Sequence, residues 1–296
     1  MKAVWYERTG PARDVLAHGE MPTPVAGPGE VRVRLEASGI NPADVGRRGG
    51  SYRAMEYPRV IPNSDGAGII DQVGDGVTRL SVGQRVWLFN GQRNGRAFGT
   101  AAEYIALAEH LVTPLPDNLS FAEGATLGIP AMTAWTCLYC DGPIVGQTVL
   151  VTGGAGAVGH YAVQLAKWGG AQVIATVSSP AKAEQARLAG ADLVVNYKTE
   201  DVVAKAMAFT GQRGVDRVVD VDFRRQHRDH AEADERELDD CGLCHQWQPH
   251  ACGADARCDG KMHRGARAGA VRAATAAAGG RPGRHHKVAR GGDTHP

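Results

Sequence analysis

A glycine-rich segment in the middle of the chain has the residue types and spacing that bind a dinucleotide. The apolar run VLV is followed by Gly154, Gly156 and Gly159, which satisfy G-x-G-x-x-G and open a helical pattern. In this motif the first glycine permits a tight turn, the second lets the backbone approach a pyrophosphate, and the third lets helix and strand pack closely. The first-turn N–H groups of such a helix have no partner inside it and face the anion. We therefore expect Gly154, Gly156, Ala157, Val158 and Gly159 to bind the pyrophosphate.

The end of the next apolar run, VIATV, decides which nucleotide is bound. A protein that binds NAD places an Asp or Glu about twenty residues past the glycines, where it accepts a hydrogen bond from the ribose 2′-OH. Here the run continues SSPAK, and the first carboxylate after it is Glu184. The hydroxyls of Ser178 and Ser179 and the ammonium of Lys182 suit a 2′-phosphate. Taken singly, the serines also suit a turn and Lys182 a solvated helix, but the missing acid favours NADPH.

The cysteines and histidines of the first 223 residues do not form a metal-binding pattern. Cys137 and Cys140 form C-x-x-C, which invites a redox interpretation. They lie at i, i+3 in an apolar helical stretch, which favours two small buried side chains instead. His18, His110 and His160 are scattered, and a zinc site needs at least three protein ligands. We expect no metal in this part of the chain.

Residues 224–296 differ sharply from the rest. They contain 8 of the 11 histidines and 4 of the 6 cysteines, and no Ile, Phe, Tyr, Ser or Asn. Within them, Cys241, Cys244 and His245 fit C-x-x-C-H, the haem-attachment signature. Three nearby side chains would also allow a zinc cluster: His250, Cys252 and Cys258. The large apolar side chains are too few to bury a core: Leu238, Leu243, Trp247, Met262, Val271 and Val288.

A third hypothesis explains both the composition and these motifs: the gene is translated out of frame after Phe223. One codon choice for FRRQHRDHAE is TTC CGG CGG CAA CAT CGA GAC CAC GCT GAA. Deleting one C after TTC turns it into FGGNIETTLK, a loop followed by the start of an amphipathic helix. The haem and zinc hypotheses need a folded or exported context that the sequence does not provide. We favour the frameshift.

The length and composition of the whole chain limit the number of domains and the classes of protein to which it can belong. The 296 residues allow two domains, and a net charge of +1 with 22% charged residues gives no bias toward nucleic acid. The N-terminus has no apolar signal core, and no run approaches the roughly 18 apolar residues of a membrane span. We expect a cytoplasmic protein that acts on a small molecule.

The secondary structure expected from the sequence changes along the chain, from strands alone to alternating strands and helices. Residues 1–120 contain short Val-, Ile- and aromatic-rich runs separated by Gly and Pro, which predict a small barrel or sandwich. Ser120 and Glu123 form a capping box before a helical stretch. Strands and helices then alternate, which predicts a doubly wound parallel sheet. The expected strands are 149–152, 172–177, 192–196 and 216–221, and the expected helices are 157–169, 180–189 and 200–210.

Several motifs together resemble the zinc-free quinone oxidoreductases (zeta-crystallin-like) of the medium-chain dehydrogenase/reductase superfamily. They are SGINPADVGRRGGSY, IPNSDGAGIIDQVGDGVTRLSVGQRV, GTAAEYIAL, LGIPAMTAW and VLVTGGAGAVG. The resemblance implies an α/β chain with a GroES-like β-barrel catalytic domain over 1–122 and a Rossmann domain over 123–223. That domain is incomplete after its fourth strand, and 224–296 is an aberrant tail. A homodimer typical of the family is doubtful with such a tail.

The resemblance also implies an activity and a set of site residues. It indicates NADPH and hydride transfer to a quinone or another electron-poor enone between the two domains. Asn41 and Tyr52 would hydrogen-bond the substrate carbonyl or the nicotinamide ribose, and Thr133 would lie against the nicotinamide. Tyr197 would add a contact to the 2′-phosphate. Tyr52 could equally be a packed loop aromatic, and a catalytically inactive nucleotide-binding relative remains the alternative function.

Zinc-dependent relatives carry a Cys and a His-Glu pair where this chain has other residues. The matching stretches are Asn41-Pro-Ala-Asp44 and Asn63-Ser-Asp65, which supply neither thiolate nor imidazole. Asn63 also stands where the family usually has Gly. Because Asn tolerates a left-handed backbone better than most residues, we expect this change to be mild.

Overall fold

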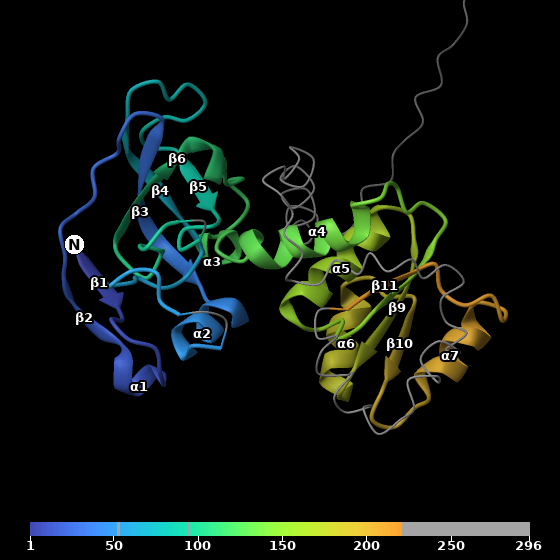
Figure 1. The fold of residues 1–296 in the computed structure, drawn as a ribbon. Helices are drawn as coiled ribbons and strands as arrows, with labels where there is room; N and C mark the ends of the chain where they lie inside the picture. The colour runs from blue at the N-terminus through green and yellow to red at the C-terminus, as the bar shows by residue number, and fades with distance from the viewer. Residues whose placement is uncertain (52–53, 94, 221–296) are drawn as a thin grey trace, which may run out of the picture.

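The computed structural model describes residues 1–51, 54–93 and 95–220, and they form two parts joined by a helical segment (Figure 1). The first part is built of antiparallel strands and the second of parallel strands with helices on both faces. The expected contribution of Tyr52, the break at Phe223 and the features predicted for 224–296 lie outside the described residues.

The first part contains a hairpin and a larger sheet. β1 (Lys2–Trp5) and β2 (Ala17–Glu20) pair antiparallel on either side of the short helix α1 (Ala12–Val15). The larger sheet has the order β6-β3-β4-β5-β7 and is antiparallel throughout. Its strands are β3 (Glu30–Gly39), β4 (Asp65–Val73), β5 (Arg85–Leu88), β6 (Tyr104–Ala108) and β7 (Val112–Pro114). Helix α2 (Pro42–Gly49) lies between β3 and β4 in the chain.

The two edge strands explain why this sheet curls into a barrel. β6 and β7 are consecutive in sequence and joined only by the 3₁₀ turn η1 (Glu109–Leu111), yet they lie on opposite edges of the sheet. Three residues can bridge the two edges only if the sheet closes on itself. From the sequence, AEYIALAEHLVTPL is one of the apolar runs of residues 1–120. The turn η1 divides it into β6 and β7, because the two halves pair with different strands. Inward-facing residues fill the barrel, including Val31, Val33, Ile70, Leu88 and Leu107.

A broken helix connects the two parts. α3 (Phe121–Gly124) begins with the expected capping box, in which the Glu123 N–H donates to Ser120 Oγ at 3.2 Å and the Ser120 N–H to the Glu123 carboxylate at 2.7 Å. It is followed by the π-helical turn η2 (Leu127–Ala131) and by α4 (Met132–Tyr139). Gly128 leaves the helical conformation with ψ −106°, and Pro130 has no N–H to donate. These two residues interrupt the helix that the sequence predicted to be continuous.

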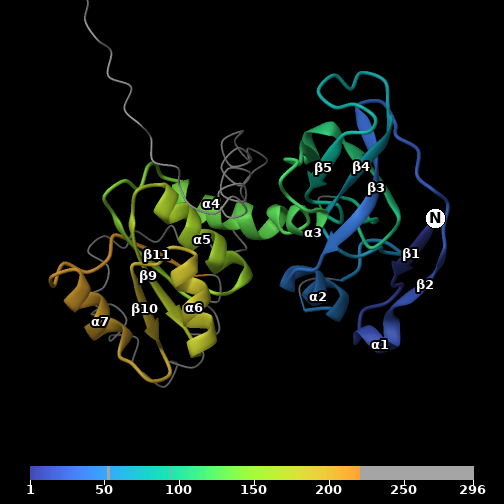
Figure 2. The same cartoon turned by 180° about the vertical axis from the view of Figure 1, so that it is seen from behind.

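The second part confirms the predicted alternation of strands and helices. Its strands are β8 (Thr148–Val151), β9 (Gln172–Val177), β10 (Leu193–Asn196) and β11 (Arg217–Val219). They pair in parallel in the order β10-β9-β8-β11, which is half of a doubly wound sheet. The connecting helices are α5 (Ala157–Trp168), α6 (Pro180–Leu188) and α7 (Val202–Phe209). Figure 2 shows α5 and α6 on one face of the sheet and α7 on the other.

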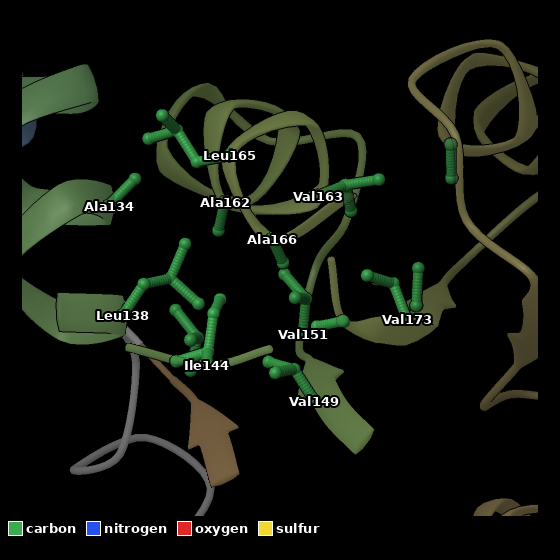
Figure 3. Close-up of a cluster of buried hydrophobic side chains, with 14 of the residues drawn as sticks. Ala134, Leu138, Ile144, Val149, Val151, Ala162, Val163, Leu165, Ala166 and Val173 are labelled. Carbon is green, nitrogen blue, oxygen red and sulfur yellow. The ribbon is translucent and has the colours of Figure 1, made fainter. Parts of the chain in front are cut away.

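Successive residues of β8 and β9 point to opposite faces of the sheet and pack into two separate hydrophobic cores. Val149, Val151 and Val173 point toward α4 and α5, where they pack with Leu138 and Leu165 (Figure 3). On the opposite face, Leu150, Ile174 and Val195 pack with Ala206 of α7. The first core therefore holds α5 against β8 and β9, and the second holds α7 against the opposite face of the same strands. Within the described ranges, no helix is long and apolar enough to cross a membrane.

Candidate cofactor and substrate site

The glycine loop between β8 and α5 is folded back onto the end of β9. The Gly154 N–H donates to the Thr176 carbonyl oxygen at 2.9 Å, and the Gly153 N–H donates to Thr176 Oγ1 at 3.2 Å. Gly159 is buried against this loop, and a Cβ there would overlap the Gly153 carbonyl group. The third glycine of the motif therefore has the close-packing role that the sequence predicts.

The tight turn is made by Gly153, and not by Gly154 as the motif suggested. Gly153 has φ +62°, a left-handed conformation that favours glycine, whereas Gly154 does not have a positive φ. Gly154 is needed for a different reason, since a Cβ at this position would lie 2.7 Å from the Cβ of Ala175. Gly153 therefore adds a fourth glycine position to the three of the motif. A Cβ at Gly156 would lie 3.2 Å from the Gly153 carbonyl oxygen.

The first turn of α5 leaves hydrogen-bond donors for an anion. The first N–H that bonds back into the helix is that of His160, which donates to the Gly156 carbonyl at 2.8 Å. In the part of the chain that the structure describes, the N–H groups of Ala157, Val158 and Gly159 have no acceptor. Unpaired donors at the positive end of a helix dipole suit a pyrophosphate.

The residues expected to select the nucleotide lie together at the end of β9. Lys182 Nζ donates to Ser178 Oγ at 3.1 Å, which places an ammonium and a hydroxyl side by side. Ser179 caps α6 instead, because its Oγ accepts from the Lys182 N–H at 3.4 Å. Tyr197 follows β10 and is more than half exposed, and its N–H donates to the Val177 carbonyl at 3.1 Å. Four residues are expected to contact the phosphate: Ser178, Ser179, Lys182 and Tyr197. Of these, only Ser178 and Lys182 have side chains hydrogen-bonded to each other in the described residues.

Asn41 belongs to a buried polar cluster where the barrel meets the connecting helix. It precedes α2, and its backbone N–H donates to the Asp44 carboxylate at 2.9 Å. Its side-chain Nδ2 donates to Asp65 Oδ2 at 2.8 Å. Ser64 Oγ donates to the other Asp44 oxygen at 3.2 Å, and Arg47 lies 3.8 Å from that same oxygen. Asn41 is thus held through both its backbone and its side chain.

Asp65 is fully buried at the first position of β4 and joins the barrel to η2. Its Oδ2 also accepts from the Ile129 N–H at 2.8 Å, while no described group donates to its Oδ1. Gly128 makes room for this carboxylate, because a Cβ there would overlap it. Burial raises the pKa of Asp65 to about 7, and the negative charge of Asp44 adds to the increase. The bonds from Ile129 and Asn41 act in the opposite direction.

Thr133 lies on the same connecting segment as Ile129, whose N–H donates to Asp65. It lies in the first turn of α4, four residues after Ile129, and is half-buried. A second contact fixes the same segment to α5, where Tyr161 Oη and Thr126 Oγ1 are 2.7 Å apart. Asn41 is thus linked through Asp65 to the Ile129 N–H, four residues before Thr133 in the chain.

The residues at the zinc-ligand positions do not fit a zinc ion. The Asn41 carboxamide and the Ser64 hydroxyl are occupied by Asp65 and Asp44, and zinc prefers thiolate, imidazole and carboxylate ligands. Among the described residues, no group of three His, Cys, Asp or Glu side chains could hold a metal. Asn63 confirms the expected left-handed backbone with φ +74°, and its Nδ2 donates to Ser38 Oγ at 2.9 Å.

Metal removal provides a direct test of this assignment. Because no thiolate or imidazole stands at the ligand positions, we expect dialysis against EDTA to leave the melting temperature of the protein unchanged. A melting temperature that falls after dialysis and returns with added zinc would contradict it.

The two cysteines do not share one environment. Cys140 is exposed with its Sγ 3.7 Å from the Asp141 carboxylate, while Cys137 is half-buried against the core of the second part. The expectation of two buried cysteines is therefore wrong for Cys140, because it lies at the exposed end of α4.

Sequence reasoning missed Asp65 and Gly128 as parts of the site. A carboxylate directly before the apolar strand GAGIIDQV was the available signal, because a charged residue at the first position of a buried strand needs partners. Nothing in the local sequence indicated that Ile129, 64 residues away, provides one of them.

Comparisons with known proteins identify both parts. Residues 27–117 match the alcohol dehydrogenase GroES-like domain, and residues 157–222 match the zinc-binding dehydrogenase family. A quinone oxidoreductase of Rattus norvegicus is 34% identical over 193 residues, covering 65% of this chain and 57% of the relative. A trans-enoyl reductase of Aspergillus terreus is 39% identical over 215 residues, covering 68% and 70%. The Escherichia coli quinone oxidoreductase solved with NADPH has a TM-score of 0.69 at 29% identity, covering 83% of this chain and 71% of that one.

Proposed function

We infer that this chain, which belongs over its first 222 residues to the zinc-free quinone oxidoreductase family of the medium-chain dehydrogenase/reductase superfamily, reduces a quinone or another electron-poor enone with NADPH. The chain spans only 57% of the length of the rat relative, so its complete activity is part of the proposal. The observation that carries it is the α5 N-terminus with free donors beside the Ser178–Lys182 pair.

Each residue of the site has a proposed part in binding and orientation. The unpaired N–H groups of Ala157 to Gly159 would bind the pyrophosphate, with Ser178, Ser179, Lys182 and Tyr197 around the 2′-phosphate. When bound, the nicotinamide supplies the hydride. Asn41 and Tyr52 would hydrogen-bond the substrate carbonyl or the nicotinamide ribose, and Thr133 would lie against the nicotinamide. None of them is an obligatory acid, because water can protonate the reduced quinone.

A catalytically inactive nucleotide-binding protein is the second candidate function. The unusual composition of residues 224–296 favours it, because those residues lack the apolar side chains of a folded domain. Oxidation of NADPH in the presence of a simple quinone, followed at 340 nm, separates the two. Turnover supports the reductase, and NADPH binding without turnover supports the inactive relative.

Substitution of Lys182 tests the choice between NADPH and NADH. We expect the unmutated chain to bind NADPH about ten- to a hundredfold more tightly, because a charge-assisted hydrogen bond contributes about 1.5–3 kcal/mol. Lys182→Glu removes the ammonium beside Ser178 and should shrink this difference. Lys2→Glu, the same charge change on the distant β1, is the control. Equal affinities of the unmutated chain for both cofactors would contradict the assignment.

We also propose that the dinucleotide-binding domain of this chain is incomplete. The proposed organisation is a barrel domain over 1–122, a partial Rossmann domain over 123–223 and an aberrant segment over 224–296. The family match stops at residue 222, which supports a boundary there. On this proposal turnover is impaired and a homodimer is doubtful. The substrate is a small molecule met in the cytoplasm, which fractionation of the source cells can test.

A further inference from the structure

The geometry points to Asp65 as a positioning residue that holds the Asn41 carboxamide of the barrel against the backbone leading to Thr133. This inference rests on the function proposed above and adds a residue to it. Asp65 itself is fully buried and is not assigned a contact with substrate or cofactor.

A single oxygen atom makes the connection. Asp65 Oδ2 accepts from Asn41 Nδ2 and from the Ile129 N–H, both at 2.8 Å. The donors come from segments 24 and 64 residues away in the chain, one at the start of α2 and one in η2. Hydrogen bonds to an ionised carboxylate are roughly twice as strong as neutral ones, and water does not compete at a buried site. The carboxylate therefore acts as a fixed link between the two proposed walls of the site.

The absence of a side chain at Gly128 allows the backbone of η2 to approach the Asp65 carboxylate. The second carboxylate oxygen, Oδ1, has no donor among the described residues and lies against Gly128, where any side chain would overlap it. The turn η2 thus brings both its Gly128 backbone and its Ile129 N–H up to one buried carboxylate. A carboxylate with a purely local role at the start of β4 would not need this approach.

The charge on Asp65 also decides which end of the Asn41 amide faces it. An ionised carboxylate only accepts, so Nδ2 must face Asp65. Asn41 Oδ1 is then turned away from Asp65, toward the Asp44 end of the capping box at the start of α2. A protonated Asp65 can donate, which allows the amide to reverse. Burial raises the pKa of Asp65 to about 7, so this change falls in an accessible pH range.

Other charged groups around Asp65 come from two elements. Asp44 on α2 raises its pKa, and Arg93 in the loop after β5 lowers it. The sequence of η2, LGIPA, contributes no titratable side chain. As the pH rises through about 7, Asp65 loses its proton and the Asn41 amide becomes fixed. Turnover should therefore increase across that range.

Two substitutions of Asp65 in the full chain separate positioning from packing. Asp65→Asn keeps an acceptor for both donors but cannot ionise, so kcat/KM should fall roughly tenfold or less and lose its pH dependence near 7. Asp65→Ala removes the acceptor, and kcat/KM should fall about 100-fold, the cost of misplacing a group by about 1 Å. NADPH affinity should fall less than kcat/KM in both, because the proposed contacts to the pyrophosphate and the 2′-phosphate lie on α5 and at the end of β9, away from Asn41. Asp71→Asn, in the same strand but paired with Arg32, is the matched control.

A second measurement does not depend on turnover. In ¹⁵N-labelled protein the Asn41 side-chain NH₂ signal, identified by its loss in Asn41→Ala, should shift with a midpoint near pH 7 and stop shifting in Asp65→Asn. A signal that ignores both the pH and the Asp65→Asn substitution would overturn the inference, as would full kcat/KM in Asp65→Ala. If the unmutated chain shows no quinone turnover, the proposed function fails, whereas the Asn41 signal still decides whether Asp65 orients the amide.

Discussion

Replacing Gly159 with alanine is expected to abolish useful NADPH binding. The new Cβ would overlap the Gly153 carbonyl group, which is backbone and cannot rotate away. Helix α5 and the loop would have to separate, and the N–H groups of Ala157 and Val158 would lose their position for the pyrophosphate. Losing two charge-assisted hydrogen bonds at about 1.5–3 kcal/mol each predicts a loss of affinity of roughly 10²- to 10⁴-fold.

Gly27→Ala is the matched control for this experiment. Gly27 precedes β3, and its added Cβ would meet only the Glu30 carboxylate at 3.4 Å, an ordinary contact. Affinity is measured by quenching of NADPH fluorescence, and folding is checked by circular dichroism. If Gly159→Ala bound NADPH as tightly as the unmutated chain, the assignment of this loop to the pyrophosphate would be wrong.

The sequence predicted best where the structure is determined by neighbours along the chain. β9 spans Gln172–Val177 as expected, because a run of apolar residues is bounded by a turn and a helix cap. The capping box at Ser120 and the left-handed backbone at Asn63 are likewise local, and both are confirmed. The parallel order of the sheet follows from the alternation of strands and helices, which permits few other connections.

The sequence predicted poorly where distant segments meet. The run AEYIALAEHLVTPL forms two strands because its first half, β6, pairs with β3 and its second half, β7, pairs with β5, on opposite edges of the sheet. Cys140 is exposed because α4 ends there, which its apolar neighbours did not reveal. Asp65 acquires its role from Ile129, and no spacing rule connects residues separated by 64 positions. Asn41 was found only through resemblance.

Within the described residues, the sheet of the second part is unsupported beyond β11. β11 pairs with β8 on one side only, and Val218 is 39% exposed on the face that α7 covers further along. The resemblance implies that an intact domain continues with a helix, a Gly-rich strand and another strand at this edge. Those elements would cover β11 and the nicotinamide side of the site. An uncovered edge is also an aggregation hazard.

Restoring the reading frame is therefore expected to have the largest effect on this protein. We expect genomic DNA read through codon 223 in all three frames to contain an alternative frame beginning FGGNIETTLK or a similar loop and helix. Expressed in that frame, the chain should unfold cooperatively at a higher temperature and turn over quinone faster than the 296-residue chain. Each large apolar side chain buried in the restored elements contributes about 1.5–3 kcal/mol, and a few of them equal a typical stability of about 5–15 kcal/mol. Equal melting temperatures and equal turnover for the two chains would show that residues 224–296 already complete the domain and that the frameshift hypothesis is wrong.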